Sequence, residues 1–208
     1  KAGITALGRE GDVLAERIDR LGKLPLHSDP ATEWRYSLGI DVLGRLVEVW
    51  SGMPFDRFLR TRIFDPLGMK DTGFNPPKSK LARIAPTEVE GDTPVRGVVH
   101  DPRARRMGGV AGHAGLFFTA SDLARYARML LNGGELDGVR IFKPETVKLM
   151  TSVQTLPSVN GRRGIGWDID TGYSGPRGEL FPLGSYGHTG WTGTSVWIDP
   201  FSKTFVIF

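Results

Sequence analysis

The sequence predicts an α+β fold, in which an antiparallel sheet is flanked by helices and accompanied by a mainly helical region. Apolar residues recur at helical spacing between residues 12 and 63 and again between residues 121 and 150, whereas strand patterns fill the stretch after Gly164. Because helices and strands occupy separate stretches, the regular βα repeat of Rossmann folds and TIM barrels is excluded. We expect a mainly helical region with a long surface loop over residues 1–107, and helices with C-terminal antiparallel strands over residues 108–208.

Three helices are predicted in the first part of the chain, over residues 12–21, 39–50 and 54–63. The apolar residues at helical spacing in the second of them are Ile40, Leu43, Leu46, Val47 and Trp50. Gly52 suits the left-handed position that follows a helix, and Pro54 suits the first position of the next one. Trp34, Trp50, Trp167 and Trp197 are expected in the core.

Residues 75–112 are rich in glycine, proline and charge, and they predict a long surface loop of the kind that often carries function. Ser121 is the expected N-cap of a helix over residues 122–131. Pro144 is expected to open a further short helix.

The last part of the chain predicts strands over residues 165–169, 186–189, 194–199 and 204–208, the final two joined by a turn. The chain begins without methionine and stops on an apolar strand, which would expose a sheet edge unless more protein covers it. We therefore expect one domain that is cut at both ends.

Composition narrows the class of protein. With 39% hydrophobic and 24% charged residues, the 208-residue chain can bury a sizeable core. The net charge of +4 is spread along the chain, which argues against a nucleic-acid binder, and no stretch reaches the roughly 18 apolar residues of a membrane span. Since there are no cysteines, disulfides and cysteine-ligated metals are excluded.

Several catalytic and nucleotide-binding patterns are missing from the chain. There is no Gly-x-Ser-x-Gly, no phosphate-binding Gly-x-x-x-x-Gly-Lys and no His-Glu-x-x-His. No serine or threonine is followed by a lysine three positions later. No metal site and no cofactor are expected.

Two segments do carry chemistry. Residues 34–44 place the pair Tyr36-Ser37 just ahead of a predicted helix, and residues 187–195 place His188-Thr189-Gly190 at the end of a predicted strand. Glycine at such a position lets the backbone approach a ligand closely.

These segments resemble two elements of the serine β-lactamase and penicillin-binding-protein superfamily, in its class C β-lactamase, esterase and D-peptidase group. Tyr36-Ser37 is similar to the Tyr-x-Asn element, and His188-Thr189-Gly190 is similar to Lys-Thr-Gly. Residues 66–74 resemble the loop after the family's helical region, and residues 108–124 resemble its glycine-rich loop and the helix that follows. The resemblance implies one catalytic domain in which an upstream Ser-x-x-Lys, outside this chain, supplies the nucleophile, so that the fragment alone is expected to be inactive.

The resemblance assigns Tyr36 a catalytic role. A free tyrosine has a pKa near 10, but a neighbouring ammonium stabilises the phenolate, so Tyr36 is expected to relay protons between the nucleophile and the leaving group. The alternative is a buried aromatic residue whose hydroxyl is merely satisfied. Ser37, beside it, is expected to contact the substrate.

On the predicted strand, His188 takes the place of the family's lysine and is expected to act in catalysis, with a hydrogen-bonded strand residue as the alternative. Thr189 and Gly190 are expected to contact the substrate. The N–H of Trp191 is expected to donate to the oxyanion. His113, in the glycine-rich loop, is a candidate substrate contact, with ordinary loop hydrogen bonding as the alternative.

Two departures from the family pattern shift the expected activity. Leu38 stands where asparagine often contacts a substrate amide, and histidine, unlike lysine, is mostly neutral at pH 7. Both favour an ester or a D-amino-acid peptide over a β-lactam as the small-molecule acyl substrate. The alternative function is a non-catalytic, penicillin-binding-like module that binds cell-wall peptide. A periplasmic, secreted or cell-envelope location is implied by the resemblance alone.

Overall fold

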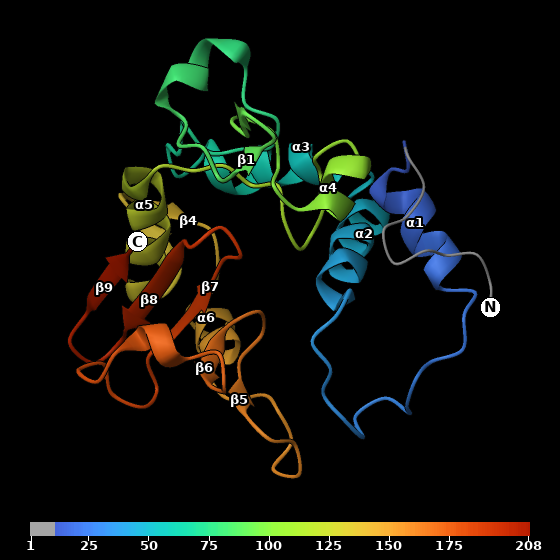
Figure 1. Ribbon diagram of the computed structural model, residues 1–208. Coiled ribbons are helices and arrows are strands. Elements are labelled where there is room, and N and C mark those ends of the chain that lie inside the picture. The colour runs from blue at the N-terminus through green and yellow to red at the C-terminus, as the bar shows by residue number, and fades with distance from the viewer. Residues whose placement is uncertain (1–10) are drawn as a thin grey trace. The chain divides into compact units, whose positions relative to one another are not determined.

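The computed structural model describes residues 11–208, which form two compact units (Figure 1). Unit 1 comprises the described residues through His27, Tyr36–Asp65 and Asp71–Phe118, and unit 2 comprises Ser28–Arg35, Pro66–Lys70 and Thr119–Phe208. The longest segment of unit 2 begins at Thr119, and the division expected after residue 107 stays a prediction. The sequence analysis expected a domain that is cut at its N-terminal end, and that end lies outside the described residues.

The helices of unit 1 pack in sequence order. They are α1 (Leu14–Leu21), α2 (Gly39–Ser51), α3 (Phe55–Leu59) and a continuing π-helical turn (Arg60–Phe64), and α2 contacts both α1 and α3. Gly44 permits this, because a Cβ there would lie 3.1 Å from Leu14 and 3.7 Å from Phe55. Gly52 ends α2 in the left-handed conformation, with φ of 67°, as predicted.

The rest of unit 1 has more regular structure than the long surface loop predicted for residues 75–112. It contains a 3-10 helix (Lys78–Arg83), the paired strands β1 (Val89–Glu90) and β2 (Thr93–Pro94), and α4 (Pro102–Arg106). Four buried residues in and around α4 form a small core: Val99, Ala104, Met107 and Ala111. The segment is irregular in outline but is anchored by this cluster.

Unit 2 begins with helices and a short hairpin: α5 (Ala120–Leu131), β3 (Glu135–Leu136), β4 (Val139–Arg140) and α6 (Pro144–Thr151). The predicted N-cap of α5 was wrong, because the hydroxyl of Thr119, not Ser121, accepts the N–H of Asp122. The β3–β4 hairpin was not predicted, although its turn residues Asp137 and Gly138 both have the positive φ that an Asp-Gly hairpin turn requires.

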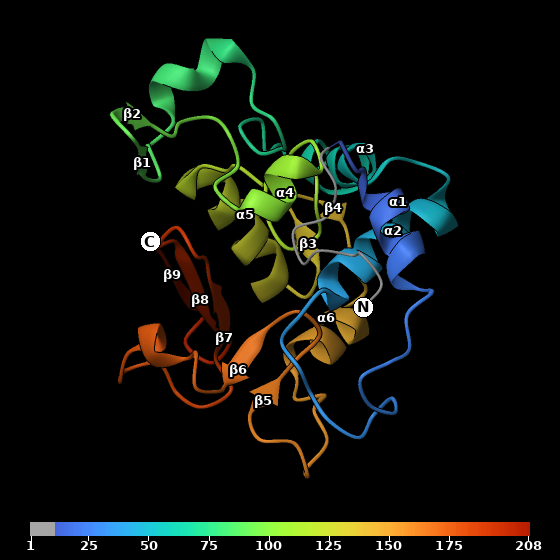
Figure 2. The ribbon, with the colours of Figure 1, turned by 45° about the vertical axis from the view of Figure 1, so that its right-hand side comes forward.

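The sheet of unit 2 is an antiparallel meander in sequence order. Its strands are β5 (Arg162–Arg163), β6 (Asp168–Asp170), β7 (Tyr186–Thr189), β8 (Ser195–Asp199) and β9 (Thr204–Ile207). In both ribbon views α5 lies alongside the sheet, where it contacts β9 (Figures 1 and 2). The predicted α+β class with an antiparallel sheet is confirmed.

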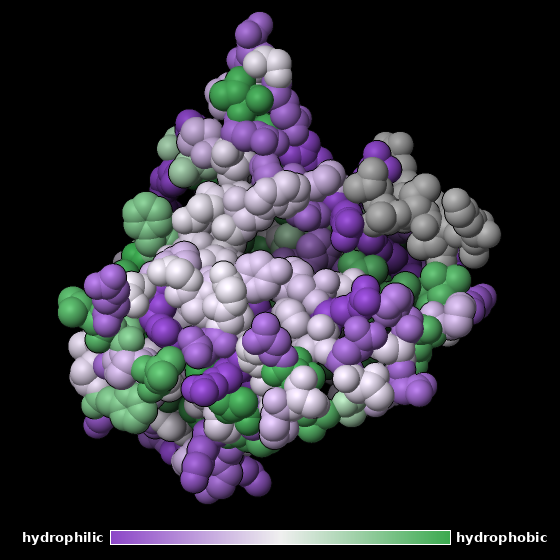
Figure 3. All heavy atoms as spheres, turned by 60° about the horizontal axis from the view of Figure 1, so that its bottom comes forward, coloured by the Kyte–Doolittle hydropathy of each residue, from purple (hydrophilic) through white to green (hydrophobic). Residues whose placement is uncertain are grey.

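Burial of the aromatic residues only partly follows the prediction. Trp197 is buried on β8, but Trp50 is 78% exposed on α2, so its expected place in the core was wrong. On the face shown in Figure 3, hydrophobic residues form separate groups among hydrophilic ones. No helix within residues 11–208 is both long and apolar enough to cross a membrane.

Candidate active site

The predicted site residues fall into two groups, one in each unit. Tyr36 and Ser37 belong to unit 1, where they immediately precede α2, and both are exposed. Leu38 occupies the N-cap position of α2, and its carbonyl accepts the N–H of Val42. The position of the Tyr36-Ser37 backbone is therefore tied to the first turn of this helix.

That first turn carries a buried carboxylate, Asp41, which has no exposed surface. One of its oxygens, Oδ1, accepts backbone N–H groups from Gly112 at 2.8 Å and from His113 at 3.1 Å. The ring Nδ1 of His113 lies 2.8 Å from Oδ1 and 2.9 Å from Oδ2. Asp41 thus joins α2 to the glycine-rich loop 72 residues further along the chain.

The other ring nitrogen of His113 is also occupied. Nε2 lies 3.1 Å from Oδ1 of Asp101, and the same oxygen accepts the backbone N–H groups of Arg103 and Ala104 at the start of α4. His113 therefore bridges two carboxylates on two helices. The expected contact between His113 and substrate stays a prediction. To hydrogen-bond a substrate, a ring nitrogen of His113 would have to share its present hydrogen bond to Asp41 or Asp101.

The charges of this cluster support one another. Burial alone would raise the pKa of Asp41, but hydrogen bonds and the charge of His113, with the N–H of Gly112, lower it overall. The pKa of Asp101 is also lowered, because hydrogen bonds from Ala104 and His113 outweigh its burial. Burial would lower the pKa of His113, but the two carboxylates raise it overall.

The second group lies in unit 2, at the end of β7. His188 and Thr189 pair with Val196 and Ser195 of β8, and Gly187 before them faces Trp197. A Cβ on Gly187 would lie 2.2 Å from the carbonyl oxygen of Val196, so only glycine fits this register. The ring Nδ1 of His188 lies 2.7 Å from the carbonyl oxygen of Thr189. Since a carbonyl only accepts, Nδ1 carries a proton in this contact.

A tight turn follows and presents Gly190 and Trp191. The N–H of Gly190 donates to the carbonyl of Thr194 at 2.7 Å, and the N–H of Gly193 donates to the carbonyl of Gly190 at 3.1 Å. A Cβ on Gly190 would lie 2.5 Å from the hydroxyl oxygen of Thr194. The indole of Trp191 is 73% exposed. The turn therefore fixes the backbone of this segment while leaving the tryptophan side chain at the surface.

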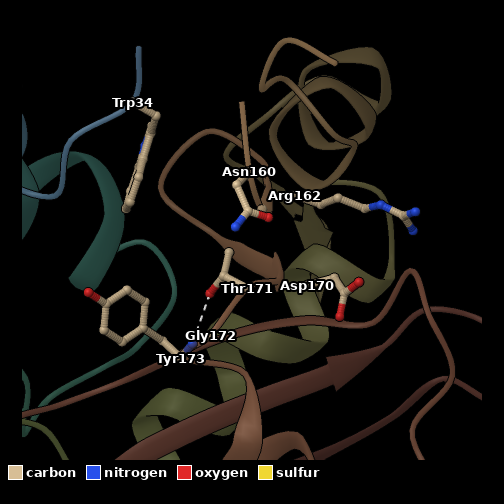
Figure 4. Close-up of a pocket in the computed structure, with 8 residues that line it drawn as sticks. Trp34, Asn160, Arg162, Asp170, Thr171, Gly172 and Tyr173 are labelled. Atoms are coloured by element: carbon tan, nitrogen blue, oxygen red, sulfur yellow. Dashed lines mark hydrogen bonds between the residues drawn. The ribbon is translucent and has the colours of Figure 1, made fainter. Parts of the chain in front are cut away.

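Unit 2 also holds an open pocket of about 420 Å³ beside β5 and β6 (Figure 4). The rings of Trp34 and Tyr173 flank one side of it, and Asn160 and Thr171 lie between them and the charged Arg162 and Asp170. The guanidinium of Arg163 lies over the Trp34 ring, 4.7 Å from its centre. Trp34, which was expected in the core, thus lines a pocket.

Asp41 and Asp101 are the residues that the sequence analysis missed. Their signal was present but weak: Asp41 lies among the apolar residues of a predicted helix, where a carboxylate needs a partner, and Asp101 precedes a proline in the N-cap manner. Within residues 11–208 no group of three His, Cys, Asp or Glu side chains is arranged to hold a metal ion.

Comparison with known proteins identifies the family of the chain. A family model described as Beta-lactamase matches residues 2–208. A protein of Escherichia coli (strain K12) named "Putative D-alanyl-D-alanine carboxypeptidase" is 35% identical over 212 residues, which cover 92% of this chain and 48% of that protein. The chain therefore spans about half the length of the curated relatives it matches.

Solved structures agree on the fold. EstCE1, described as a hydrolase with promiscuous acyltransferase activity, has a TM-score of 0.72 at 23% identity, covering 99% of this chain and 58% of its own. The octameric penicillin-binding protein homologue from Pyrococcus abyssi has a TM-score of 0.66 at 20% identity, covering 94% of this chain and 43% of its own. At these identities the likeness concerns the fold alone.

Proposed function

Because this chain belongs to the β-lactamase family, we propose that the full-length protein is a serine hydrolase that cleaves an ester or amide bond through an acyl-enzyme. One observation carries the proposal. The Tyr36-Ser37 pair stands at the start of α2, and His188-Thr189-Gly190 stands at the end of the central strand β7, each with its backbone held by specific contacts. These are the two elements of the family's site that lie within this chain.

In this proposal the nucleophile is the serine of a Ser-x-x-Lys motif in the part of the full-length protein outside residues 1–208. The serine Oγ attacks the acyl carbon, and its proton passes through Tyr36 to the leaving amine or alcohol as the scissile bond breaks. Water then attacks the ester of the acyl-enzyme and releases the acid. Tyr36 acts as the proton relay, and Ser37 beside it contacts the substrate.

The β7 segment binds and polarises the acyl group. The backbone N–H of Trp191 and the nucleophile's own N–H donate to the oxygen that gains charge in the tetrahedral intermediate. The hydroxyl of Thr189 and the bare backbone of Gly190 contact the substrate. His188 replaces the fixed cation of the family pattern, and its Nδ1–H is already directed to the Thr189 carbonyl.

We place D-amino-acid peptides and esters ahead of β-lactams as substrates. The carboxypeptidase name of the 35%-identical relative supports the peptide. Leu38 and His188 also favour this order, since Leu38 offers no polar group to a substrate amide and His188 replaces the fixed cation that would hold a β-lactam carboxylate.

A substrate panel on the full-length protein tests the proposal. A p-nitrophenyl ester, a peptide ending in D-Ala-D-Ala and nitrocefin should be hydrolysed, with nitrocefin the poorest of the three by kcat/KM. Tyr36→Phe should lower the rate for every substrate that the protein hydrolyses. Reversible peptide binding without turnover would contradict the proposal and favour the non-catalytic binding module.

A further inference from the structure

The contacts of His113 define its protonation state. A neutral imidazole has one N–H, yet both ring nitrogens of His113 lie within 3.1 Å of carboxylate oxygens, those of Asp41 and Asp101. If the ring were neutral, one nitrogen lone pair would face a carboxylate oxygen at hydrogen-bond distance. Only the imidazolium donates to both.

The proton cannot reside on Asp41 instead. Asp41 is fully buried and its Oδ1 accepts two backbone N–H groups, from Gly112 and His113, which favour the ionised carboxylate. Asp101 likewise accepts two backbone N–H groups at the start of α4. Two ionised carboxylates therefore contact a ring that is 20% exposed. A positively charged imidazolium is the form of the ring that they stabilise.

Three charged residues near the cluster, Arg105, His100 and Arg45, have partners outside it. Arg105 of α4 binds Glu90 and the carbonyl of Val99. His100, next to Asp101, pairs with Glu88 at 3.0 Å. Arg45, on the next turn of α2, binds Asp19 and Glu48. The charge balance at His113 is thus set by Asp41 and Asp101.

The cluster has a direct mechanical link to Tyr36. A Cβ on Gly112 would lie 2.2 Å from the carbonyl oxygen of Ile40, so the loop backbone rests on the first turn of α2. Asp41 belongs to that same turn, and the turn begins at Leu38, two residues after Tyr36. Whatever holds Asp41 against Gly112 and His113 also holds the segment that carries Tyr36.

We propose that His113, Asp41 and Asp101 form a clamp, closed by the proton on His113, that positions Tyr36 for proton transfer. The effect of the clamp on catalysis rests on the proposed function, whereas the protonation of His113 and its contacts with Asp41 and Asp101 do not. His113 is a positioning residue here. Losing its proton removes one of the two ring donors, frees the turn to shift, and lowers kcat more than it changes KM.

The pH dependence of kcat in the full-length protein tests the clamp. We expect kcat to fall as His113 deprotonates above pH 6.5. Asp101→Asn keeps an N-cap and a hydrogen-bond acceptor but removes a charge, so it should move that midpoint roughly 1 pH unit lower. His113→Gln should lower kcat roughly tenfold or more at pH 6, leave KM within about twofold, and abolish this limb.

His100→Gln is the matched control, because His100 also pairs with a carboxylate in unit 1, that of Glu88 at 3.0 Å. It should leave the pH profile unchanged. A midpoint that stays in place in Asp101→Asn, or that moves equally in His100→Gln, contradicts the clamp.

A second readout does not depend on turnover. Long-range ¹H–¹⁵N correlation spectra of the full-length protein should show both nitrogens of His113 protonated at pH 6, with the signal assigned by its loss in His113→Gln. Amide hydrogen exchange at residues 40–43 should be faster in His113→Gln than in the unchanged protein at the same pH. If no acyl substrate is hydrolysed but these two results hold, the proposed function fails and the clamp stands. One unprotonated ring nitrogen at pH 6 overturns the clamp.

Discussion

The two halves of the candidate site are held by different forces. In unit 1, the segment before α2 depends on side chains: a fully buried Asp41, the bridging His113 and the capping Asp101. In unit 2, the end of β7 depends on the backbone: its ladder with β8 and the turn bonds of Gly190 and Gly193. The segment of the proposed proton relay, Tyr36, is thus held by charged side chains, and the proposed oxyanion donor, the N–H of Trp191, is held by main-chain hydrogen bonds.

This difference teaches where each half is vulnerable. A charge network responds to pH and to replacement of a side chain, because each ionised group is stabilised by the others. A strand and turn tolerate side-chain replacement at exposed positions, but not a Cβ where backbones touch or the loss of a backbone N–H. Four experiments separate these sensitivities, from the largest expected effect to the smallest.

Replacement of the relay should have the largest effect. Tyr36→Phe removes only the hydroxyl of an exposed ring, so folding should be unaffected. Loss of a positioned acid or base typically costs about 10²–10⁴-fold in rate, and we expect kcat to fall within that range. Steady-state hydrolysis of a p-nitrophenyl ester measures it. A variant with unchanged kcat would remove Tyr36 from the mechanism.

At Trp191 the backbone should matter and the ring should not. Trp191→Ala keeps the N–H and should change kcat by no more than about threefold, whereas Trp191→Pro deletes the donor and should lower kcat roughly 10²–10³-fold. Both rates are compared after thermal unfolding confirms that the variants are folded. Equal losses in the two variants would show that the indole, and not its amide, carries the role.

Close packing of the glycine-rich loop on α2 should appear in stability. Gly112→Ala places a Cβ 2.2 Å from the Ile40 carbonyl and should lower the free energy of unfolding by about 1–3 kcal/mol. Gly39→Ala is the matched control. Gly39 lies beside Ile40 in the first turn of α2, but nothing lies within 4 Å of an added Cβ, so the free energy of unfolding should stay the same or rise slightly. Urea unfolding of the full-length protein measures both. Equal effects would contradict the close approach.

The smallest effect should be a pH dependence of stability that comes from the charge network of unit 1. The folded pKa of His113 is raised, so its contribution is complete below about pH 6.5 and is lost as pH rises through the folded pKa. The folded pKa values of Asp41 and Asp101 are lowered, so their contributions are lost as pH falls below about 3.8. His113→Gln should flatten the alkaline decline of Tm. A decline of unchanged size in this variant would assign it to other groups.

Sequence reasoning was most successful where the chain's own pattern decides the structure. The helical spacing of apolar residues located α2 and its glycine end, and β7 begins and ends where its pattern predicted. Local chemistry was less certain: Thr119 and Ser121 are both acceptable caps, and only the path of the chain into α5 selects Thr119. The Asp-Gly signal at residues 137–138 was present but overlooked.

The network around His113 was beyond the reach of a single sequence. Asp41 and His113 are 72 residues apart, and nothing in their local sequence fixes which carboxylate the ring will meet. A buried aspartate on a helix indicates that some partner exists, but the partner is chosen by the tertiary approach of Gly112 to Ile40. The motifs led to the family, whereas the contacts that hold the segment before α2 in place could not be predicted from them.

The acyl-enzyme itself offers the most direct test of the central claim. Intact-mass spectrometry of the full-length protein, quenched during turnover of a slow ester substrate, should show one added acyl group that disappears as hydrolysis completes. In Tyr36→Phe the same adduct should form more slowly, since the relay that takes the serine proton is missing. A protein that hydrolyses the substrate with no adduct at any quench time, or that forms the adduct at the same rate without Tyr36, would contradict the account.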